Sequence, residues 1–254
     1  MIGLSEQSLK SMVPAAFAET HPMSSRYAQF RTTDALAIAA DNGYYPVDAA
    51  QPKAKKRNPE FVKHMIVLRH ESVIADGGDT VPQVLLYNSH NGRTTFRMHV
   101  GLYRFVCSNG LVAGEDLYAF ALRHNLDAAK QVGDFLSGII GHANDLSNVI
   151  DVWSRKQLTE GQSVGFARRA AELRWGERGG TYEPRALLEA RRDDDDGNSL
   201  WQVFNRVQEA TVKGGVHGIS SNKARAVKSR PLTEIQSNIE YNRQLWNTAA
   251  ALAA

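Results

Sequence analysis

The sequence predicts an α+β fold in which an antiparallel β-meander of hairpins packs against long helices, with a helical C-terminal part. One observation is the alternation of apolar and polar residues from Phe96 to Val100, which is typical of a half-buried strand. Another is the spacing of apolar residues three and four apart over 127–158, which indicates an amphipathic helix. Strands are therefore expected in the first half of the chain and helices in the second.

The composition is typical of a globular protein with a sizeable core. Of 254 residues, 43% are hydrophobic and 22% are charged. The single cysteine, Cys107, lies in a predicted strand, where we interpret it as a small buried hydrophobe. One cysteine excludes an internal disulfide framework and favours the reducing cytoplasm. The N-terminal ten residues lack a signal-peptide pattern, and no apolar run approaches the ~18 residues of a membrane span, so neither export nor a membrane location is expected.

Short apolar runs separated by glycine-containing turns predict the strands of the meander. The predicted strands are 64–70, 81–88 and 93–107, and 117–122 is either a further strand or the start of the next helix. Turns are expected at 76–79, at Asn91-Gly92 and at Asn109-Gly110, because Asn and Gly tolerate positive φ. Together these segments predict a curved antiparallel sheet with one face available for packing.

Capping residues predict where the helices begin. The predicted helices are 35–41, ending at Asn42-Gly43; 127–158; 159–175, capped by Thr159; 184–192, opened by Pro184; 200–210, capped by Ser199 and ending at Gly214-Gly215; and a last one from Thr233. The segment between Pro46 and Pro59 is predicted to be an exposed loop. These boundaries suggest three regions, namely an N-terminal segment with a basic loop (1–60), a core of β-meander and helices (61–175) and a helical C-terminal region with a basic loop (176–254).

Local clusters of positive charge are more informative than the net charge. The formal charge is only +3, from 30 basic and 27 acidic residues. Residues 213–230 contain five lysines and arginines and no acidic residue. Clusters of this kind are either solvated surface or contacts to a polyanion. The residues predicted to contact nucleic acid are Lys53, Lys55, Lys56, Arg57, Arg93, Arg97, Tyr103, Arg104, Lys213, Lys223, Arg225, Lys228 and Arg230. Tyr103 is included because it offers a stacking face for a base, although core packing explains it equally well.

The sequence lacks the motifs of the common enzyme classes. No two histidines are spaced His-x-x-x-His, and there is no Cys-x-x-Cys pair, phosphate-binding loop or Gly-x-Ser-x-Gly elbow. The four consecutive aspartates 193–196 are interpreted as a solvated loop, because adjacent residues rarely converge on one ion. We therefore predict no catalytic residue, no metal site and no cofactor, with a metal-dependent nuclease as the alternative.

Two segments together resemble a known protein family. They are Val106-Cys107-Ser108-Asn109-Gly110-Leu111, and the run from Leu200-Trp201 through Phe204-Asn205-Arg206-Val207-Gln208-Glu209 to Gly214-Gly215, followed by a basic loop and Asn242-Arg243-Gln244-Leu245-Trp246. This pattern, over about residues 25 to 248, resembles a phage and plasmid family catalogued only as a domain of unknown function, in the nine-hundred-thirties of that series. The resemblance implies a setting in mobile elements and supplies no catalytic residues.

A second resemblance concerns the layout alone. A meander followed by long helices, with basic residues on the strands and on a distal loop, is similar to single-strand annealing proteins of the phage RecT, lambda Red and eukaryotic Rad types. This resemblance implies a ring or filament that binds a nucleic-acid backbone in a positively charged groove.

The two resemblances and the charge pattern lead to one expected function and one alternative. The expectation is a non-enzymatic DNA-binding protein of a phage, prophage or plasmid. It would bind single-stranded DNA or anneal it, as a homo-oligomeric ring or filament, in recombination or replication. The alternative is a mobile-element protein that binds and inhibits a host defence protein complex.

Overall fold

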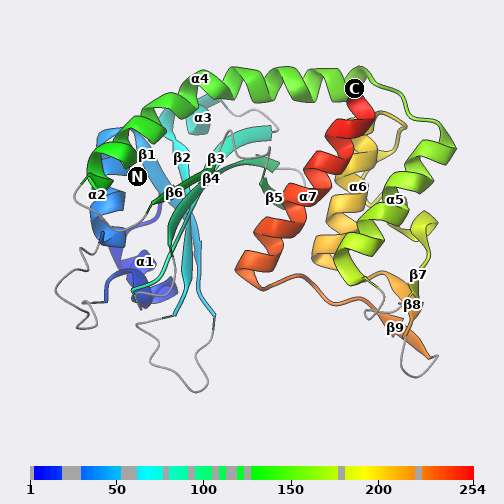
Figure 1. The fold of residues 1–254 in the computed structure, drawn as a ribbon, viewed down its shortest axis with the longest axis horizontal. Helices are drawn as coiled ribbons and strands as arrows, with labels where there is room; N and C mark the ends of the chain where they lie inside the picture. The colour runs from blue at the N-terminus through cyan, green and yellow to red at the C-terminus, as the bar shows by residue number, and fades with distance from the viewer. Residues whose placement is uncertain are drawn as a thin grey trace. The chain divides into compact units, whose positions relative to one another are not determined.

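The protein is described by a computed structural model, which covers residues 3–18, 30–52, 62–76, 80–90, 95–104, 109–112, 119–122, 127–176, 181–220 and 225–254 (Figure 1). The chain divides into two compact units. The first comprises Met1–Gly110 and Glu115–Asn144, and the second comprises Leu111–Gly114 and Asp145–Ala254. Antiparallel strands and helices occur together, with helices prevailing in the C-terminal part, so the predicted α+β class is confirmed.

An antiparallel sheet forms the centre of the first unit. Its strands are β1 (Tyr44–Ala50), β2 (His64–His70), β3 (Thr80–Asn88), β4 (Phe96–Arg104), β5 (Asn109–Val112) and β6 (Ala119–Leu122). The order is β1-β2-β3-β4-β5, and β6 also pairs with β4. The helices of this unit are α1 (Glu6–Met12), the 3₁₀ turn η1 (Pro14–Ala16), α2 (Thr32–Asp41), α3 (Glu71–Asp76) and the first part of α4 (Ala128–Arg155).

One face of this sheet carries the core of the first unit. Ile66, Leu86 and Met98 lie opposite one another on β2, β3 and β4, and all three are fully buried. Because side chains alternate between faces with a period of two, this register gathers the apolar residues of three strands into one layer. On β1, the Tyr44 hydroxyl donates a hydrogen bond to the backbone oxygen of Leu136 at 3.3 Å, which ties the sheet to α4.

Helices dominate the second unit, and a small sheet completes it. Its elements are the end of α4, α5 (Glu160–Trp175), β7 (Thr181–Tyr182), the 3₁₀ turns η4 (Pro184–Leu187) and η5 (Asp193–Asp195), α6 (Leu200–Lys213), β8 (His217–Ile219), β9 (Ala226–Lys228) and α7 (Ile235–Ala253). Figure 1 shows α5, α6 and α7 side by side, with the sheet β7-β8-β9 at one end of them. Trp153 packs against Phe204 and Trp246, with ring centroids 5.4 and 4.3 Å away, and these rings form the core.

The predicted caps of α5 and α6, Thr159 and Ser199, are confirmed, and each is part of a capping box. The Ser199 hydroxyl accepts a hydrogen bond from the backbone N–H of Gln202, and the Gln202 side chain accepts one from the Ser199 N–H, both at 3.3 Å. Thr159 and Gln162 make the same reciprocal pair at the start of α5. The cap of the last helix was predicted one residue too early. Its N-cap is Glu234, whose carboxylate accepts from the N–H of Ser237.

Several predicted boundaries are wrong. Residues 46–50 belong to β1 and not to a loop, because a proline is tolerated in an edge strand and the pairing of β1 with β2 shifts between Pro46 and Asp48. The predicted turn Asn109-Gly110 lies in β5, where strand pairing overrides a local turn preference. The predicted helix 184–192 is reduced to the 3₁₀ turn η4. The strands β7, β8 and β9 were missed because two or three residues are too few for an alternating pattern.

Candidate nucleic-acid interface

The end of α6 leads into the β8–β9 hairpin, which brings several cations onto one face. The ladder of the hairpin continues beyond its strands, since Gly215 N–H donates to Ser229 O at 2.9 Å and Ser229 N–H donates to Val216 O at 2.8 Å. His217 pairs with Lys228 in this hairpin, whereas Gly215 and Val216 both bond to Ser229, so the regular register ends in a β-bulge at Gly215. Alternation places His217 and Ile219 on the same face of the hairpin as Lys228 and Ala226.

This face is exposed, whereas the opposite face packs on the unit. His217, Lys228 and Arg230 are exposed, and 56% of the Ile219 surface is accessible. On the opposite face Tyr182 stacks on Trp175 with ring centroids 3.9 Å apart, and it covers Gly218 so closely that a Cβ there would lie 2.5 Å from the Tyr182 ring. We call the exposed residues His217, Arg225, Lys228 and Arg230 the cationic hairpin face; His217 and Lys228 share one face of the strands, and Arg225 and Arg230 lie just before and just after β9.

The cations of this face lack acidic partners. Among the described residues, no carboxylate lies within 4 Å of Arg225, Lys228 or Arg230. Exposed cations without carboxylate partners keep their full charge for an external anion, which is the requirement for contact with a phosphate backbone.

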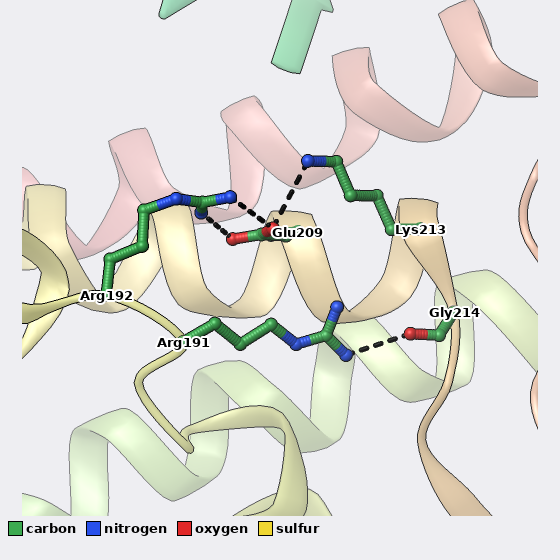
Figure 2. A network of polar contacts seen from close by, with 5 residues as sticks. All are labelled: Arg191, Arg192, Glu209, Lys213 and Gly214. Carbon is green, nitrogen blue, oxygen red and sulfur yellow. Dashed lines mark hydrogen bonds and ion pairs between the residues drawn. The ribbon is translucent and has the colours of Figure 1, made fainter. Parts of the chain in front are cut away.

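The neighbouring arginines 191 and 192 reach two different partners, as Figure 2 shows. Arg191 Nη2 donates to the backbone oxygen of Gly214, just past the end of α6, at 2.8 Å. A cation there complements the unpaired carbonyls and the negative end of the helix dipole. Arg192 instead makes a two-pronged ion pair with Glu209, in which Nη2 lies 2.9 Å from Oε1. One loop therefore places one arginine at the C-terminal end of α6 and the next arginine at Glu209.

Glu209 is a buried carboxylate that forms ion pairs with two cations. Only 5% of its side chain is exposed, and Lys213 Nζ lies 3.2 Å from its Oε1 (Figure 2). Burial alone raises the pKa of the Glu209 carboxyl, but hydrogen bonds from Arg192 and Lys213 outweigh that effect and leave the pKa below its ordinary value. Lys213 was predicted to contact nucleic acid, and the structure shows that part of its charge is used inside the protein.

The predicted contact residues are distributed over both units. Lys213, Arg225, Lys228 and Arg230 belong to the second unit. Arg97 belongs to the first, where it is half-buried in β4 opposite Tyr87. The backbones of Tyr103 and Arg104 lie in β4 opposite Val81 and Thr80, but their side chains are outside the described part of the structure. The remaining predicted residues also lie outside the described residues, as does Cys107; they are Lys53, Lys55, Lys56, Arg57, Arg93 and Lys223.

Sequence reasoning did not include Arg191. Its partner, the Gly214 carbonyl, is 23 residues away in the chain, and nothing local distinguishes Arg191 from Arg192. The only available signal was the adjacency of two arginines before the aspartate run.

Histidines gather in the core of the first unit. Thr32 Oγ1 lies 2.8 Å from His64 Nε2 and 3.1 Å from His90 Nε2, and Asn88 Nδ2 donates to it at 3.0 Å. Burial, together with the nearby His90, lowers the pKa of His64 to about 3, so the imidazole is neutral. Within the described ranges, no group of three or more His, Cys, Asp or Glu side chains is placed to hold a metal ion. This cluster is a hydrogen-bond network around one hydroxyl.

None of the helices in the described ranges has both the length and the apolar character required to cross a membrane.

Comparisons with known proteins place the chain in a family. Over its whole length it is similar to two proteins of Escherichia coli (strain K12). It is 32% identical to UPF0380 protein YafZ in an alignment 254 residues long, which covers 98% of this chain and 91% of the relative. It is 31% identical to UPF0380 protein YfjQ over 252 residues, with the same coverage of both chains. No solved structure matches it. Residues 21–246 match the family described as Domain of unknown function (DUF932). This match includes α6 and the cationic hairpin face, and by its extent the chain belongs to the DUF932 family.

Proposed function

We propose that this protein binds DNA, with a preference for single strands, through the cationic hairpin face. The observation that carries the proposal is the gathering of Lys228, Arg230 and Arg225 on and beside one exposed hairpin, without a carboxylate neighbour among the described residues. Exposed Ile219 lies on the same face, directly across from Ala226, and offers apolar contact for a base. A polyanion is the partner that such a face fits, because each neutralised phosphate releases counterions.

The proposal extends to the biological setting that we expect from the sequence. The protein would act as a homo-oligomer, without catalysis of its own, in recombination or replication of a phage, prophage or plasmid. Particle images with and without an oligonucleotide address this extension. Rings or filaments around DNA support it, whereas particles that stay monomeric in both conditions contradict it.

The test is the salt dependence of binding to a labelled oligonucleotide, measured by fluorescence anisotropy. The wild type is expected to bind at low salt and to weaken steeply as salt rises. The triple variant R225Q/K228Q/R230Q should weaken binding for all base sequences alike. It should also reduce the slope of log K against log[salt] by about 2, since each lost contact to a single strand contributes about 0.7.

The matched control carries the same change in net charge. The variant K10Q/R169Q/R185Q removes three exposed cations that are each already paired with a carboxylate, namely Glu6, Glu172 and Glu160. It should bind almost as the wild type does. A wild type that fails to bind at low salt, or a control that loses as much affinity as the triple variant, contradicts the proposal. Tighter binding to a duplex than to a single strand contradicts the strand preference alone.

A further inference from the structure

Gly215 leaves a notch in the cationic hairpin face, and two cations converge on it. A Cβ at this position would lie 3.6 Å from Lys228 Cε and 3.7 Å from Arg191 Nη2. Gly215 has φ of +87°, a conformation that favours glycine, and its N–H donates to the backbone oxygen of Ser229, the residue before Arg230. The side chains of a loop arginine and a strand lysine therefore approach the same small space from two sides.

We propose that this notch is a binding site for a phosphodiester group of the nucleic-acid backbone, held by Arg191 and Lys228 with Arg230 alongside. The inference rests on the proposed function and deepens it, because it identifies the chemical group that is bound and adds Arg191, which lies outside the hairpin. The step involves binding only, with no covalent change.

The contrast between Arg191 and Arg192 supports an external anion. Arg192 and Lys213 share the buried carboxylate of Glu209, which compensates one of their two positive charges within the protein (Figure 2). Arg191 and Lys228 converge without such compensation, since no carboxylate of the described residues lies within 4 Å of either side chain. The two positive charges of Arg191 and Lys228 repel each other, and an anion bound between them offsets this repulsion.

The Arg191 side chain is oriented in advance for this role. Its Nη2 is fixed by the Gly214 carbonyl at 2.8 Å, in a partly buried position. The guanidinium has five N–H donors in a planar fork, so a bond to one carbonyl leaves others for phosphate oxygens. A side chain that is already ordered loses less conformational entropy when the ligand binds.

The arrangement fits a phosphate polymer better than a single small anion. Lys228 is the last residue of β9 and exposed Arg230 follows two residues later, and residues two apart in an extended chain are about 6.6 Å apart. Neighbouring phosphates of an extended strand are spaced comparably. An acidic peptide is the other polymer that cations attract, but its carboxylates hang on flexible side chains and lack this regular spacing.

The test measures binding of a labelled single-stranded oligonucleotide by R191Q, R191K and K228Q, with R185Q as control. Arg185 is an exposed arginine of the same unit, paired with Glu160. R191Q and K228Q should each weaken binding about tenfold, in line with the loss of a charge-assisted hydrogen bond. Each should also lower the salt slope by about 0.7. R191K keeps the positive charge but loses the planar, forked guanidinium. Direct contact between Arg191 and a phosphate therefore predicts that R191K weakens binding. A contribution from the positive electrostatic field alone predicts no change in affinity.

Two competitors define the bound group. An abasic deoxyribose-phosphate strand should displace the labelled oligonucleotide from the wild type, and a polyglutamate peptide of equal charge should not. If polyglutamate competes equally well, the phosphodiester assignment is overturned in favour of an acidic protein partner.

The outcomes separate the two proposals. If the wild type binds but R191Q and K228Q behave like R185Q, the notch is not the phosphate site and the proposed function stands. If the wild type binds no oligonucleotide at low salt, both are overturned. Because Arg191 also contacts the end of α6, thermal unfolding of R191Q is measured in parallel. If R191Q is unfolded, the comparison of K228Q with R185Q still tests the proposal. K228Q should fold, because no hydrogen bond of the described residues depends on the Lys228 side chain.

Discussion

At the scale of single residues, the charges of the second unit depend on one buried carboxylate. Glu209 is held by Arg192 from the preceding loop and by Lys213 from the next turn of its own helix. Removing a buried partner leaves cations without compensation, which costs more than the pair itself contributes. Glu209 therefore keeps the loop that carries Arg191 attached to α6.

Substitution of Glu209 by glutamine is expected to lower the free energy of unfolding by about 2 kcal/mol, because Arg192 loses a two-pronged charge-assisted partner. Urea unfolding at neutral pH measures this loss. The exposed pair Glu240–Arg243 provides the control, and E240Q should cost less than about 1 kcal/mol.

The pKa of Glu209 is depressed in the folded state, so the contribution of Glu209 to stability is present above the ordinary value of 4.5 and is lost as pH falls below it. The difference in the free energy of unfolding between wild type and E209Q should therefore shrink in acid, and a difference that grows contradicts this account.

His64 makes the stability of the first unit depend on pH. Its pKa is lowered from 6.5 to about 3 in the folded state, so the unfolded chain binds more protons between these values. Its contribution is complete above pH 6.5 and decreases towards pH 3, by about 1.4 kcal/mol per pH unit in the middle of the window. Urea unfolding at pH 7, 6 and 5 should show a shallower decline for H64Q than for the wild type. Parallel declines for the two proteins disprove the assignment to His64.

At the scale of elements, two glycines with different surroundings show how context decides the effect of a substitution. Gly138 is an exposed residue in α4, and a Cβ added to it would have no atom within 4 Å apart from its chain neighbours and the backbone of its own helix, so G138A should raise the free energy of unfolding by about 0.5–1 kcal/mol. Gly214 ends α6 with φ of +71°, and a Cβ there would lie 2.7 Å from the carbonyl carbon of Arg230. G214A should lower the free energy of unfolding by about 2 kcal/mol or more. Urea unfolding of both variants measures the two effects, and equal signs contradict the reasoning.

The hairpin also shows why some elements could not be predicted. The caps of α5 and α6 could be predicted because the hydroxyl of a capping residue bonds to a backbone N–H within the first turn of the helix. The strands β8 and β9 contain three residues each, so their pairing depends on the backbone contact between 214–216 and 229–230 and on Tyr182 covering Gly218. These contacts join distant segments, and no local pattern indicates them.

At the scale of the whole molecule, net charge says little about binding. A formal charge of +3 is small for a chain of 254 residues. The effect of the charge on binding depends on where each cation lies. Some cations, such as Arg192, pair with a carboxylate, whereas Arg225, Lys228 and Arg230 have no carboxylate partner among the described residues. The salt dependence of the triple variant against its charge-matched control therefore tests placement and not total charge.

The sequence by itself determined the α+β class, most helices and three strands of the main sheet, because periodicity and caps are local signals. It also indicated the family and the acid-free run 213–230. Only the tertiary structure decided which cations share a face. It assigned Lys213 to Glu209, paired Lys228 with His217 across the hairpin and brought Arg191 to Gly215. The reason is that a strand's register and a loop's path depend on contacts between segments far apart in the chain.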